Sequence, residues 1–405
     1  MQIKKILAVI GGGAAGFFAA ITAAENNPDL KVIILEQGNE VLGKVKISGG
    51  GRCNVTHACF DVKELVKFYP RGHKELLGPF YRFNTEHTIQ WFEYRGVELK
   101  TEADGRMFPV SDSSQSIMDC LIETATAYDI KIIKQAKVMR LDVADSFQIY
   151  FNDRELKADY LLIASGSSNT IWQQLKKLGH EIIEPVPSLF TFNIRHELIK
   201  GLEGISFQQV SLSLKEAKIE TQGALLITHT GLSGPAILKL SAFAARLLNE
   251  KKYQFELMIN WIDSSTDEAM LRLKSEKDIQ AKRQASNFSP FELPQRFWLK
   301  VLEVNGIPAN KLVADLSRNE LQNIANALTK CVLKVHSKNT NKEEFVTAGG
   351  ISLKEVDFKT MESKLIPNLF FAGEVLDIDA VTGGFNFQAA WTTGFIAGSS
   401  LAEKA

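Results

Sequence analysis

Net charge, cysteine pairs and long apolar runs are all missing from this 405-residue chain. Lys plus Arg and Asp plus Glu both number 47, so no single-sign field draws the chain to nucleic acid or to an anionic membrane. The four cysteines form no C-x-x-C pair and no disulfide framework, which indicates reduced thiols in a cytoplasmic protein. No apolar run reaches transmembrane length, and no repeat or low-complexity tract is present. These absences favour a soluble globular protein with room for two or three domains.

A basic pair followed by an apolar run imitates a signal peptide at the N-terminus. Lys4 and Lys5 precede the run, but the three glycines Gly11, Gly12 and Gly13 interrupt it. A second apolar run follows soon after, so we expect two strands of a cytoplasmic domain rather than a leader.

The first 36 residues contain a glycine pattern in a specific context. The first apolar run stops at Gly11-x-Gly13-x-x-Gly16, an Ala-rich helical pattern follows, and Glu36 ends the second run. In the dinucleotide-binding fingerprint the glycines make the turn, admit the pyrophosphate and let helix and strand pack, while the acid binds the ribose. The helix N-terminus offers N–H groups to the phosphates. The pattern therefore predicts nucleotide binding. An ordinary glycine turn would not explain Glu36.

A second glycine cluster, Gly49 to Gly51, lies between Lys44 and Arg52. One interpretation is a backbone that passes close to an anionic or flat ligand. The other is a flexible surface loop. The neighbouring nucleotide site favours the first.

The end of the chain returns to the pattern of its beginning. An apolar run ends at Gly373-Glu374, and the turn Gly383-Gly384 precedes a helix rich in small residues. A Rossmann unit completed by the last strand and helix, with an acid after the strand, favours FAD over NAD as the bound dinucleotide. The final helix would aim its N-terminus at the flavin ring, where positive potential stabilises the charge of the reduced ring.

The middle of the chain predicts inserted domains. Residues 188–262 and 331–345 are strand-rich and predict an antiparallel, barrel-like domain, while residues 263–330 predict a small helical subdomain. The FAD-binding domain would comprise residues 1–187 and 346–405. The predicted fold class is therefore α/β, with a split Rossmann-like FAD-binding domain, an inserted barrel-like domain and a helical insertion within it.

Six segments together resemble one bacterial family of NAD(P)/FAD-dependent oxidoreductases, the aminoacetone-oxidase-like or bile-acid-reductase-like flavoproteins. They are G-x-G-x-x-G, the S-G-G-G-R-C-N segment within residues 46–56, and residues 228–236, 347–351, 360–364 and 371–377. The resemblance covers nearly the whole chain and implies the same split FAD domain with its insertions. Ala164-Ser165-Gly166-Ser167 departs from the family's A-T-G-G, and residues 168–172 form a shorter segment than usual. The shape of the substrate side is therefore not implied.

The pattern and the resemblance together predict a set of cofactor-binding residues and a smaller set of catalytic candidates. The FAD set is Gly11, Gly13, Ala14, Ala15, Gly16, Glu36, Gln37, Lys44, Gly50, Gly51, Arg52, Cys53, Asn54, Val138, Ala164, Ser165, Gly166, Gly373, Glu374, Asp377, Gly384, Phe385, Asn386 and Phe387. The catalytic candidates are His229, Arg106 and Cys53, and no metal site is predicted. A redox disulfide between Cys53 and Cys59 is not expected, because their C-x5-C spacing is longer than that of a redox pair.

Three functions are consistent with these predictions. The first is an FAD-dependent oxidoreductase that moves a hydride between a small amine, ketone or enone and flavin N5, with NAD(P)H or oxygen as the second electron partner. Residues 150–340 contain no second G-x-G-x-x-G for a dedicated NAD(P)H domain. The second is a flavin-dependent modifier of tRNA or another nucleic acid, which the neutral net charge disfavours. The third is a non-catalytic flavin-binding module. Substrate and oligomeric state are not set by the sequence.

Overall fold

The computed structural model describes residues 4–215, 217–339 and 346–405, which form two compact units. The first, here called the Rossmann unit, is Met1–Val186 together with Val346–Ala405, and the second, the inserted unit, is Pro187–Phe345. The predicted fold class is confirmed: an α/β domain split in sequence, with a closed barrel inserted between its halves. Residues 340–345 of the predicted insertion segment lie outside the described residues.

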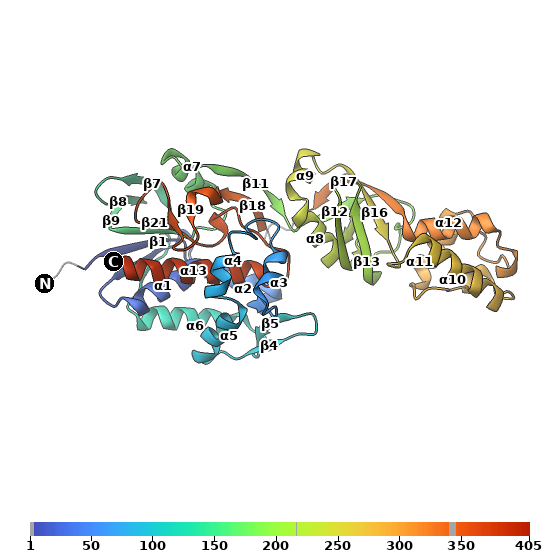
Figure 1. The fold of residues 1–405 in the computed structure, drawn as a ribbon, viewed down its shortest axis with the longest axis horizontal. Coiled ribbons are helices and arrows are strands. Elements are labelled where there is room, and N and C mark those ends of the chain that lie inside the picture. Colours follow the sequence, from blue (N-terminus) through green and yellow to red (C-terminus); the bar gives the residue numbers. More distant parts are fainter. Residues whose placement is uncertain (1–3, 216, 340–345) are drawn as a thin grey trace. The chain divides into compact units, whose positions relative to one another are not determined.

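A seven-stranded sheet organises the Rossmann unit, with the strand order β19-β20-β21-β10-β1-β2-β6 (Figure 1). Five strands are parallel: β21 (Leu369–Phe371), β10 (Tyr160–Ile163), β1 (Ile6–Ile10), β2 (Lys31–Leu35) and β6 (Lys131–Ile133). The antiparallel edge strands are β20 (Glu362–Ser363) and β19 (Val356–Asp357). The central strands are apolar at every position because both faces of a parallel sheet are covered.

Helices α1 (Ala14–Asn26) and α13 (Phe385–Lys404) run side by side and join the two halves of the Rossmann unit (Figure 1). Small residues allow their close approach. A Cβ atom on Gly398 would lie 2.5 Å from the carbonyl oxygen of Ala19, and one on Gly394 would lie 2.9 Å from that of Ala15. The glycines of α13 therefore let the last helix pack directly on the backbone of the first.

The rest of the Rossmann unit consists of short helices and two small antiparallel sheets. The sheets are β3-β5-β4 and β7-β8-β9, and the helices precede the connection to the inserted unit. Their bounds are β3 (Thr56–His57), β4 (Leu99–Thr101), β5 (Arg106–Pro109), β7 (Val138–Val143), β8 (Phe147–Phe151), β9 (Arg154–Ala158), α2 (Gly43–Gly51), α3 (Val62–Leu65), α4 (Leu77–Arg82), α5 (Thr85–Tyr94), α6 (Ser114–Ala127) and α7 (Asn169–Lys177). Ser113 caps α6 by accepting a hydrogen bond from the Gln115 N–H. Strand β6, which precedes these hairpin strands, pairs in parallel with β2 and is an edge strand of the Rossmann sheet.

The inserted unit is a closed six-stranded barrel with the order β12-β15-β14-β13-β16-β17 and helices attached to it. The strands are β12 (Thr191–Ile194), β13 (Ser206–Leu214), β14 (Ile219–Ile227), β15 (Gly231–Ser233), β16 (Phe255–Asn260) and β17 (Cys331–Asn339). The helices are α8 (Pro235–Phe243), α9 (Ala245–Glu250), α10 (Thr266–Ile279), α11 (Gln295–Val304) and α12 (Arg318–Thr329). Phe207, Trp261 and Phe297 form an aromatic cluster in its core, with ring centroids 4.8–4.9 Å apart. Capping boxes at Ser265 and Ser317 begin α10 and α12, as the polar Ser-x-x-Glu spacing favours.

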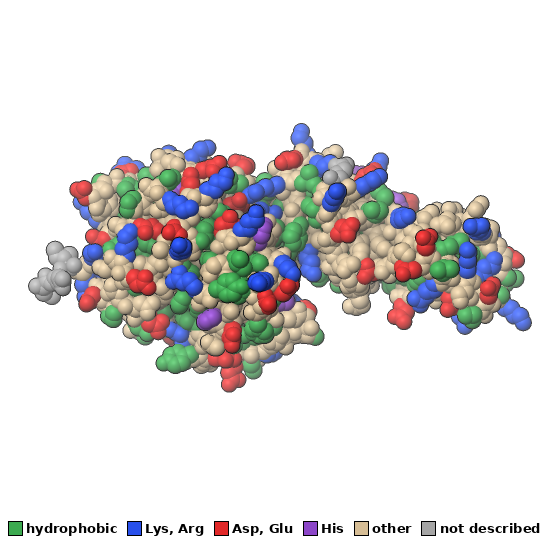
Figure 2. Space-filling model, in the orientation of Figure 1, with side chains coloured by type: hydrophobic (Ala, Val, Ile, Leu, Met, Phe, Trp, Pro, Cys, Tyr) green, Lys and Arg blue, Asp and Glu red, His purple; other side chains and the backbone are tan. Residues whose placement is uncertain are grey.

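Two short strands, β11 (Ile182–Ser188) and β18 (Val346–Ile351), pair with each other where the chain leaves and re-enters the Rossmann unit. On the visible face of each unit, Lys and Arg side chains are interspersed with Asp and Glu (Figure 2). Among the described residues, no helix has the length and apolar character needed to span a membrane.

Candidate functional site

The turn after β1 has the conformation that its glycines predict. Gly11 has φ +113°, and a Cβ atom there would lie 2.3 Å from the carbonyl oxygen of Ala164 on the neighbouring strand. A Cβ atom on Gly16 would lie 2.0 Å from the Gly11 oxygen. Gly13, the N-cap of α1, differs: apart from its two neighbours in the chain, no described atom lies within 4 Å of its Cβ position. Side chains are excluded from the packed positions, while the front of the helix, with Ala14 and Ala15 in its first turn, stays open for an anion.

Glu36 lies at the end of β2, held by backbone donors on both oxygens. Its Oε2 accepts from the Gly12 N–H at 2.8 Å, and its Oε1 accepts from the Gly38 N–H at 2.7 Å. A carboxylate has about four acceptor positions, so two remain for ribose hydroxyls. The carboxylate is therefore fixed in place and still able to accept further hydrogen bonds.

A hollow beside this carboxylate gathers several of the predicted FAD residues. Gly11, Glu36, Gln37, Val138 and Ser165 all line it; the other lining residues are Ile10, Leu35, Ala136, Ser168, Thr170 and Ile171. Lined by strand ends and the start of the glycine turn, it lies where the carboxyl ends of parallel strands form ligand crevices.

Ser165 gives an independent indication of a ligand in this hollow. Its Oγ atom is buried and has no hydrogen-bond partner within the described residues. A buried hydroxyl without a partner costs about 1–3 kcal/mol. The neighbouring residues Ala164 and Gly166 follow strand β10, and Gly166 has φ +58°. The hollow therefore fits the polar adenosine half of FAD, which would satisfy the Ser165 hydroxyl.

The S-G-G-G segment begins as a helix rather than as a loop. Helix α2 is kinked at Ser48 to Gly50, where the glycines turn to positive φ. A Cβ atom on Gly49 would lie 2.9 Å from the Phe108 ring, so this glycine packs. At Gly50 and Gly51 no described atom from outside the adjoining stretch of helix α2 lies within 4 Å of the Cβ position. The helix ends because the glycines adopt left-handed backbone, and two of them face open space.

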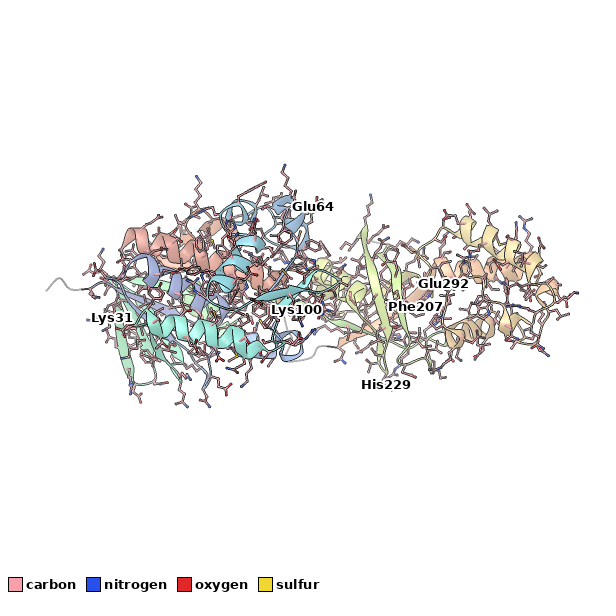
Figure 3. All side chains as sticks on the ribbon, turned by 90° about the horizontal axis from the view of Figure 1, so that it is seen from below. Lys31, Glu64, Lys100, Phe207, His229 and Glu292 are labelled. Carbon is pink, nitrogen blue, oxygen red and sulfur yellow. The ribbon has the colours of Figure 1, made fainter. Side chains whose placement is uncertain are left out.

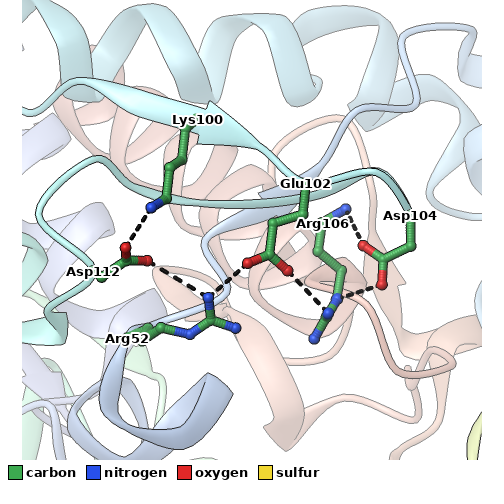
Figure 4. A network of polar contacts seen from close by, with 6 residues as sticks. All are labelled: Arg52, Lys100, Glu102, Asp104, Arg106 and Asp112. Atoms are coloured by element: carbon green, nitrogen blue, oxygen red, sulfur yellow. Dashed lines mark hydrogen bonds and ion pairs between the residues drawn. The ribbon is translucent and has the colours of Figure 1, made fainter.

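Arg52 follows this kink and lies within a network of six charged side chains (Figure 4). Its guanidinium pairs with Glu102 at 2.6 Å and Asp112 at 3.5 Å, and it lies 3.9 Å from the centroid of the Phe108 ring. The hydrogen bond to Glu102 raises the Arg52 pKa above its ordinary value. Both ion pairs are made by Nη1, and the predicted contact of Arg52 with FAD stays a prediction.

Arg106 occupies the other side of the same network. It bonds Glu102 at 2.9 Å and Asp104 at 2.7 Å, and its guanidinium also lies over the Phe108 ring, 5.4 Å from the centroid (Figure 4). Its donors are directed to these carboxylates, which suits a structural clamp on strand β5. Its predicted catalytic role stays a prediction.

The C-terminal half of the site meets the N-terminal half at Gly373 and Glu374. Gly373 has φ +74°, and a Cβ atom on it would lie 2.8 Å from the Ala15 Cβ in helix α1. Glu374 accepts from the Thr347 N–H at 3.1 Å and pairs with Lys44. The predicted FAD residues Lys44 and Glu374, 330 positions apart, are thus brought together by the fold.

The segment after Glu374 is buried rather than solvated. Asp377 is 8% exposed, and its N–H donates to the Ile351 oxygen at 3.1 Å. Asp379 is fully buried and forms a bidentate ion pair with Arg71. Of these two acids, Asp379 holds the chain that leads to the Gly383-Gly384 turn.

The two glycine-rich segments, S-G-G-G-R-C-N-V-T and T-G-G-F-N-F-Q, are bonded directly to each other. With its amide oxygen toward Gly384, Asn54 accepts from the Gly384 N–H at 2.9 Å and donates to the Thr56 oxygen at 3.0 Å and the Met107 oxygen at 3.2 Å. A Cβ atom on Gly384, which has φ +92°, would lie 2.5 Å from the Thr56 oxygen. The first segment therefore packs against the backbone of Gly384 at a distance that leaves no room for a side chain there.

A buried polar network extends this contact into the first turns of α13. The Gln388 Oε1 accepts from the hydroxyls of Thr56 at 2.6 Å and Thr88 at 3.0 Å, and Trp391 Nε1 donates to the Val55 oxygen at 2.9 Å. Each of these polar groups has a hydrogen-bond partner, and a buried polar network with its hydrogen bonds made is rigid. The network therefore fixes the position of the α13 N-terminus.

Three predicted residues at the start of α13 direct their side chains into the protein. Phe385 is buried and stacks on Phe68 with ring centroids 4.1 Å apart. The Asn386 side chain bonds both backbone atoms of Ala380, at 2.9 and 3.1 Å, and Phe387 stacks on Trp391. These side-chain contacts hold the start of α13, and the predicted contacts of the three residues with FAD stay predictions.

Cys53, a candidate for both lists, is a packed thiol. It is fully buried, and burial raises its pKa to about 12. All four cysteines are free. A neutral, buried thiol is neither a nucleophile nor a ready partner for exchange. Cys53 therefore packs as a neutral thiol beside the glycine segment, and its predicted roles stay predictions.

His229 lies in the inserted unit, exposed in the turn between β14 and β15 (Figure 3). The FAD residues listed above all belong to the Rossmann unit. The predicted catalytic role of His229 stays a prediction. Among the described residues, no group of His, Cys, Asp and Glu is arranged to hold a metal ion.

Sequence reasoning missed His57, Phe68 and Gln388. All three contact or adjoin the Gly383-Gly384 turn: His57 Nδ1 lies 3.1 Å from the Gly383 oxygen, and its ring stacks on Phe385 at 4.5 Å. His57 directly follows the segment of residues 46–56, and Gln388 lies just after the Gly383-Gly384 turn. Their closeness in sequence to these glycines is the signal that could have identified them.

The fold and the site define an FAD-dependent oxidoreductase whose flavin domain is split in sequence around a barrel. The chain belongs to the family described as HI0933-like protein Rossmann domain, whose model matches residues 5–400. The predicted family resemblance is confirmed.

Curated relatives are similar over nearly the whole chain. A 3-dehydro-bile acid delta(4,6)-reductase of Clostridium scindens is 26% identical over 410 residues, covering 98% of this chain and 99% of the relative. A ribosomal RNA dihydrouridine synthase of Escherichia coli is 26% identical over 403 residues, covering 97% of each.

Solved structures share the fold. A flavocytochrome c3 fumarate reductase superposes with a TM-score of 0.51 at 14% identity, over 98% of this chain and 78% of that one. A 3-ketosteroid-delta4-(5alpha)-dehydrogenase from Rhodococcus jostii RHA1 gives 0.50 at 15% identity, over 98% and 96%. At these identities the likeness concerns the fold alone.

Proposed function

We propose that this chain is an FAD-dependent reductase that transfers a hydride from flavin N5 to a carbon–carbon double bond conjugated to a carbonyl group. The observation that supports the proposal is that the names of two relatives, each similar over nearly its full length, both describe reduction of a carbon–carbon double bond. A delta(4,6)-reductase of a 3-dehydro bile acid reduces ring double bonds near a 3-oxo group. A dihydrouridine synthase reduces the double bond of a uracil ring. In both substrates the double bond is polarised by a carbonyl, which makes it a hydride acceptor.

The residues of the Rossmann unit suit such a reaction. Bound FAD would supply the hydride chemistry, and the protein would supply binding, orientation and electrostatics. Glu36, Ser165 and the open front of α1 would hold the adenosine and pyrophosphate. Within the described chain no side chain caps α13 at Gly384, so the positive end of this 20-residue helix is available to negative charge on the flavin.

NAD(P)H is the electron donor we propose, bound transiently at the flavin. The inserted unit is a closed antiparallel barrel with helices, not a second parallel nucleotide domain. Without a dedicated domain, NAD(P)H would reduce the flavin and leave before the substrate enters the same space. This order predicts ping-pong kinetics.

RNA is a second candidate for the molecule that carries the double bond. Two relatives, from Escherichia coli and Haemophilus influenzae, are ribosomal RNA dihydrouridine synthases. The inserted unit has more Lys and Arg than Asp and Glu, whereas the Rossmann unit has the reverse. The neutral charge of the whole chain therefore conceals a basic inserted unit, which would suit a polyanion.

Anaerobic reoxidation of the reduced flavin tests the function directly. The FAD-loaded protein is reduced with NADH, NADPH or dithionite and mixed with a 3-oxo-Δ4 steroid, cyclohexenone, uridine or a ribosomal RNA transcript. Recovery of the visible flavin absorbance by an enone, and not by the matched saturated ketone, would support the proposal. Recovery only with the transcript, with two hydrogens added to a uridine by mass spectrometry, would favour the RNA substrate. Flavin reoxidised only by oxygen, or reduced by amines, would overturn the proposal.

A further inference from the structure

Arg52 is the only charged residue of the segment 48–56, and its side chain is held at one nitrogen and on one face. Its Nη1 pairs with Glu102 at 2.6 Å and with Asp112 at 3.5 Å (Figure 4). The guanidinium carbon lies 3.9 Å from the centroid of the Phe108 ring, which is fully buried. The fold therefore fixes the plane of this guanidinium.

The other edge of the same guanidinium has no partner within the described residues. Nη1 makes all the ion pairs of Arg52, so Nε and Nη2 are left. Arg71 and Arg106 differ, because each uses both its Nε and its Nη2 on carboxylates. The Nε–Nη2 edge is a two-donor fork that suits an anionic oxygen. Arg52 thus keeps this edge for a ligand, and its side chain is 33% exposed.

The chain places Arg52 close to the start of α13. Asn54, two residues further on, accepts a hydrogen bond from the Gly384 N–H at 2.9 Å. Consecutive Cα atoms are about 3.8 Å apart, so the Cα atoms of Arg52 and Asn54 lie within about 7.6 Å of each other. Before Arg52 come Gly50 and Gly51, whose Cβ positions meet no described atom from outside the adjoining stretch of α2 within 4 Å. Arg52 therefore lies between this open backbone and the helix that would face the flavin.

Reduction of a double bond conjugated to a carbonyl needs positive charge at the carbonyl oxygen. When a hydride adds to the carbon β to the carbonyl, the electron pair of the double bond is displaced toward the carbonyl oxygen. The product of this step is an enolate, which takes a proton from water at the α carbon. Donors that are already aimed at the oxygen lower the barrier, because their interaction strengthens as the negative charge develops.

We propose that the Nε–Nη2 edge of Arg52 binds the carbonyl oxygen of the substrate and stabilises the enolate that hydride transfer produces. This inference rests on the proposed function. In one turnover the substrate gains a hydride from reduced FAD and a proton from water, while Arg52 keeps its own protons. Arginine suits this role because its guanidinium does not lose a proton in proteins.

The charged groups around Arg52 allow an oxyanion to approach. The network of Figure 4 contains three cationic and three anionic side chains: Arg52, Lys100, Arg106, Glu102, Asp104 and Asp112. Their formal charges balance, so an incoming oxyanion meets no net negative charge. Because the ion pairs at Nη1 and the Phe108 ring already order the guanidinium, little entropy is lost when its other edge binds.

Three substitutions separate the two-donor edge from the charge and from the network. Arg52→Lys keeps a positive charge next to Glu102 but loses the edge. Arg52→Gln loses the charge as well. Lys100→Gln removes another cation of the same network, the one that pairs with Asp112, and is the matched control.

Two measurements are made on each FAD-loaded protein. The oxidised protein is titrated with 4-chlorophenol, because a phenolate oxygen imitates the enolate and a phenolate stacked on oxidised flavin gives a long-wavelength charge-transfer band. The dithionite-reduced protein is then reoxidised with cyclohexenone or with ferricyanide, which takes electrons without forming an oxyanion. The affinity of each apoprotein for FAD is measured separately.

We expect Arg52→Gln to weaken 4-chlorophenolate binding by about tenfold or more. Reoxidation by cyclohexenone should slow by about 10²- to 10³-fold, with the loss in kcat rather than in KM, because the interaction is strongest in the transition state. Arg52→Lys should recover part of both, since it keeps the charge without the fork. Reoxidation by ferricyanide and FAD affinity should stay within about twofold of the wild type, and Lys100→Gln should match the wild type throughout.

Unchanged 4-chlorophenolate affinity in Arg52→Gln would overturn the proposal, as would a wild type that binds no 4-chlorophenolate or a variant that is slowed equally with cyclohexenone and ferricyanide. Weaker FAD binding in both Arg52 variants, with the phenolate affinity of the FAD-saturated proteins unchanged, would assign the edge to the cofactor instead. If Arg52→Gln does not fold, Arg52→Lys is read in its place. Failure of the wild type with every conjugated substrate would refute the proposed function, and the phenolate titration then still decides whether Arg52 holds an oxyanion.

Discussion

Replacement of Gly384 and of Gly50 by alanine tests what the glycines of the site are for. Both residues have positive φ, +92° and +69°. A Cβ atom on Gly384 would lie 2.5 Å from the Thr56 oxygen and 2.9 Å from the side-chain amide of Asn54. A Cβ atom on Gly50 meets no described atom from outside the adjoining stretch of helix α2 within 4 Å. The two substitutions share the backbone strain and differ in the space around the new methyl group.

The magnitudes follow from that difference. Left-handed backbone costs an alanine about 1–2 kcal/mol, and forcing a methyl group into packed backbone adds about 1–3 kcal/mol. We therefore expect the free energy of unfolding of the FAD-free protein to fall by about 1–2 kcal/mol in Gly50→Ala and by about 2–5 kcal/mol in Gly384→Ala. Urea unfolding followed by circular dichroism measures both. Equal losses in the two variants would refute the packing argument.

FAD affinity should separate the pair further. If the open space at Gly50 receives the cofactor, Gly50→Ala should weaken FAD binding by about tenfold or more, equivalent to about 1.4 kcal/mol, despite its small effect on the apoprotein. Titration of apoprotein with FAD, followed by quenching of flavin fluorescence, measures the affinity. Wild-type affinity in Gly50→Ala would remove this residue from the FAD site.

Three further predictions concern buried groups. Arg71→Ala removes the bidentate partner of the fully buried Asp379 and should lower the unfolding free energy by about 3–5 kcal/mol. Lys67→Ala, in an exposed pair, should lower it by less than about 1 kcal/mol, and similar urea midpoints would contradict this. Ser165→Ala should weaken FAD binding by about tenfold, with recovery in Ser165→Thr; unchanged affinity would place the hydroxyl outside the site. Burial raises the pKa of Cys53 from 9.0 to about 12, so the folded protein keeps the thiol neutral at pH values where the unfolded chain ionises it. The free energy of unfolding should therefore fall as pH rises from 9.0 toward 12, and it should fall less in Cys53→Ala.

The N-terminal fingerprint was predictable because its function lies in local geometry. Gly11, Gly16 and Glu36 are required by a strand–turn–helix unit whose parts are adjacent in sequence, and the structure shows those contacts. The barrel was predictable for a similar reason, since period-two patterns and turns are local signals.

Side-chain roles within the same motifs were less predictable. Arg52 looked like an anion ligand, yet the fold places Glu102 and Asp112 beside it. Cys53 was a candidate for both the FAD set and the catalytic set, and only the fold shows that its side chain is fully buried. The type of a residue determines which interactions its side chain can make. Its actual partners belong to segments that are distant in sequence and are known only from the fold.

The sequence by itself determined the class of this protein: a dinucleotide turn, a split flavin domain and an inserted barrel follow from glycine spacing and hydrophobic periodicity. Only the tertiary structure decided the centre of the site. Asn54, Thr56 and His57 meet Gly383 and Gln388 across more than 300 residues, through hydrogen bonds and a contact too close for any side chain at Gly384. Such long-range contacts leave no periodic signal in either segment, because the hydrogen-bond partners of each segment belong to the other.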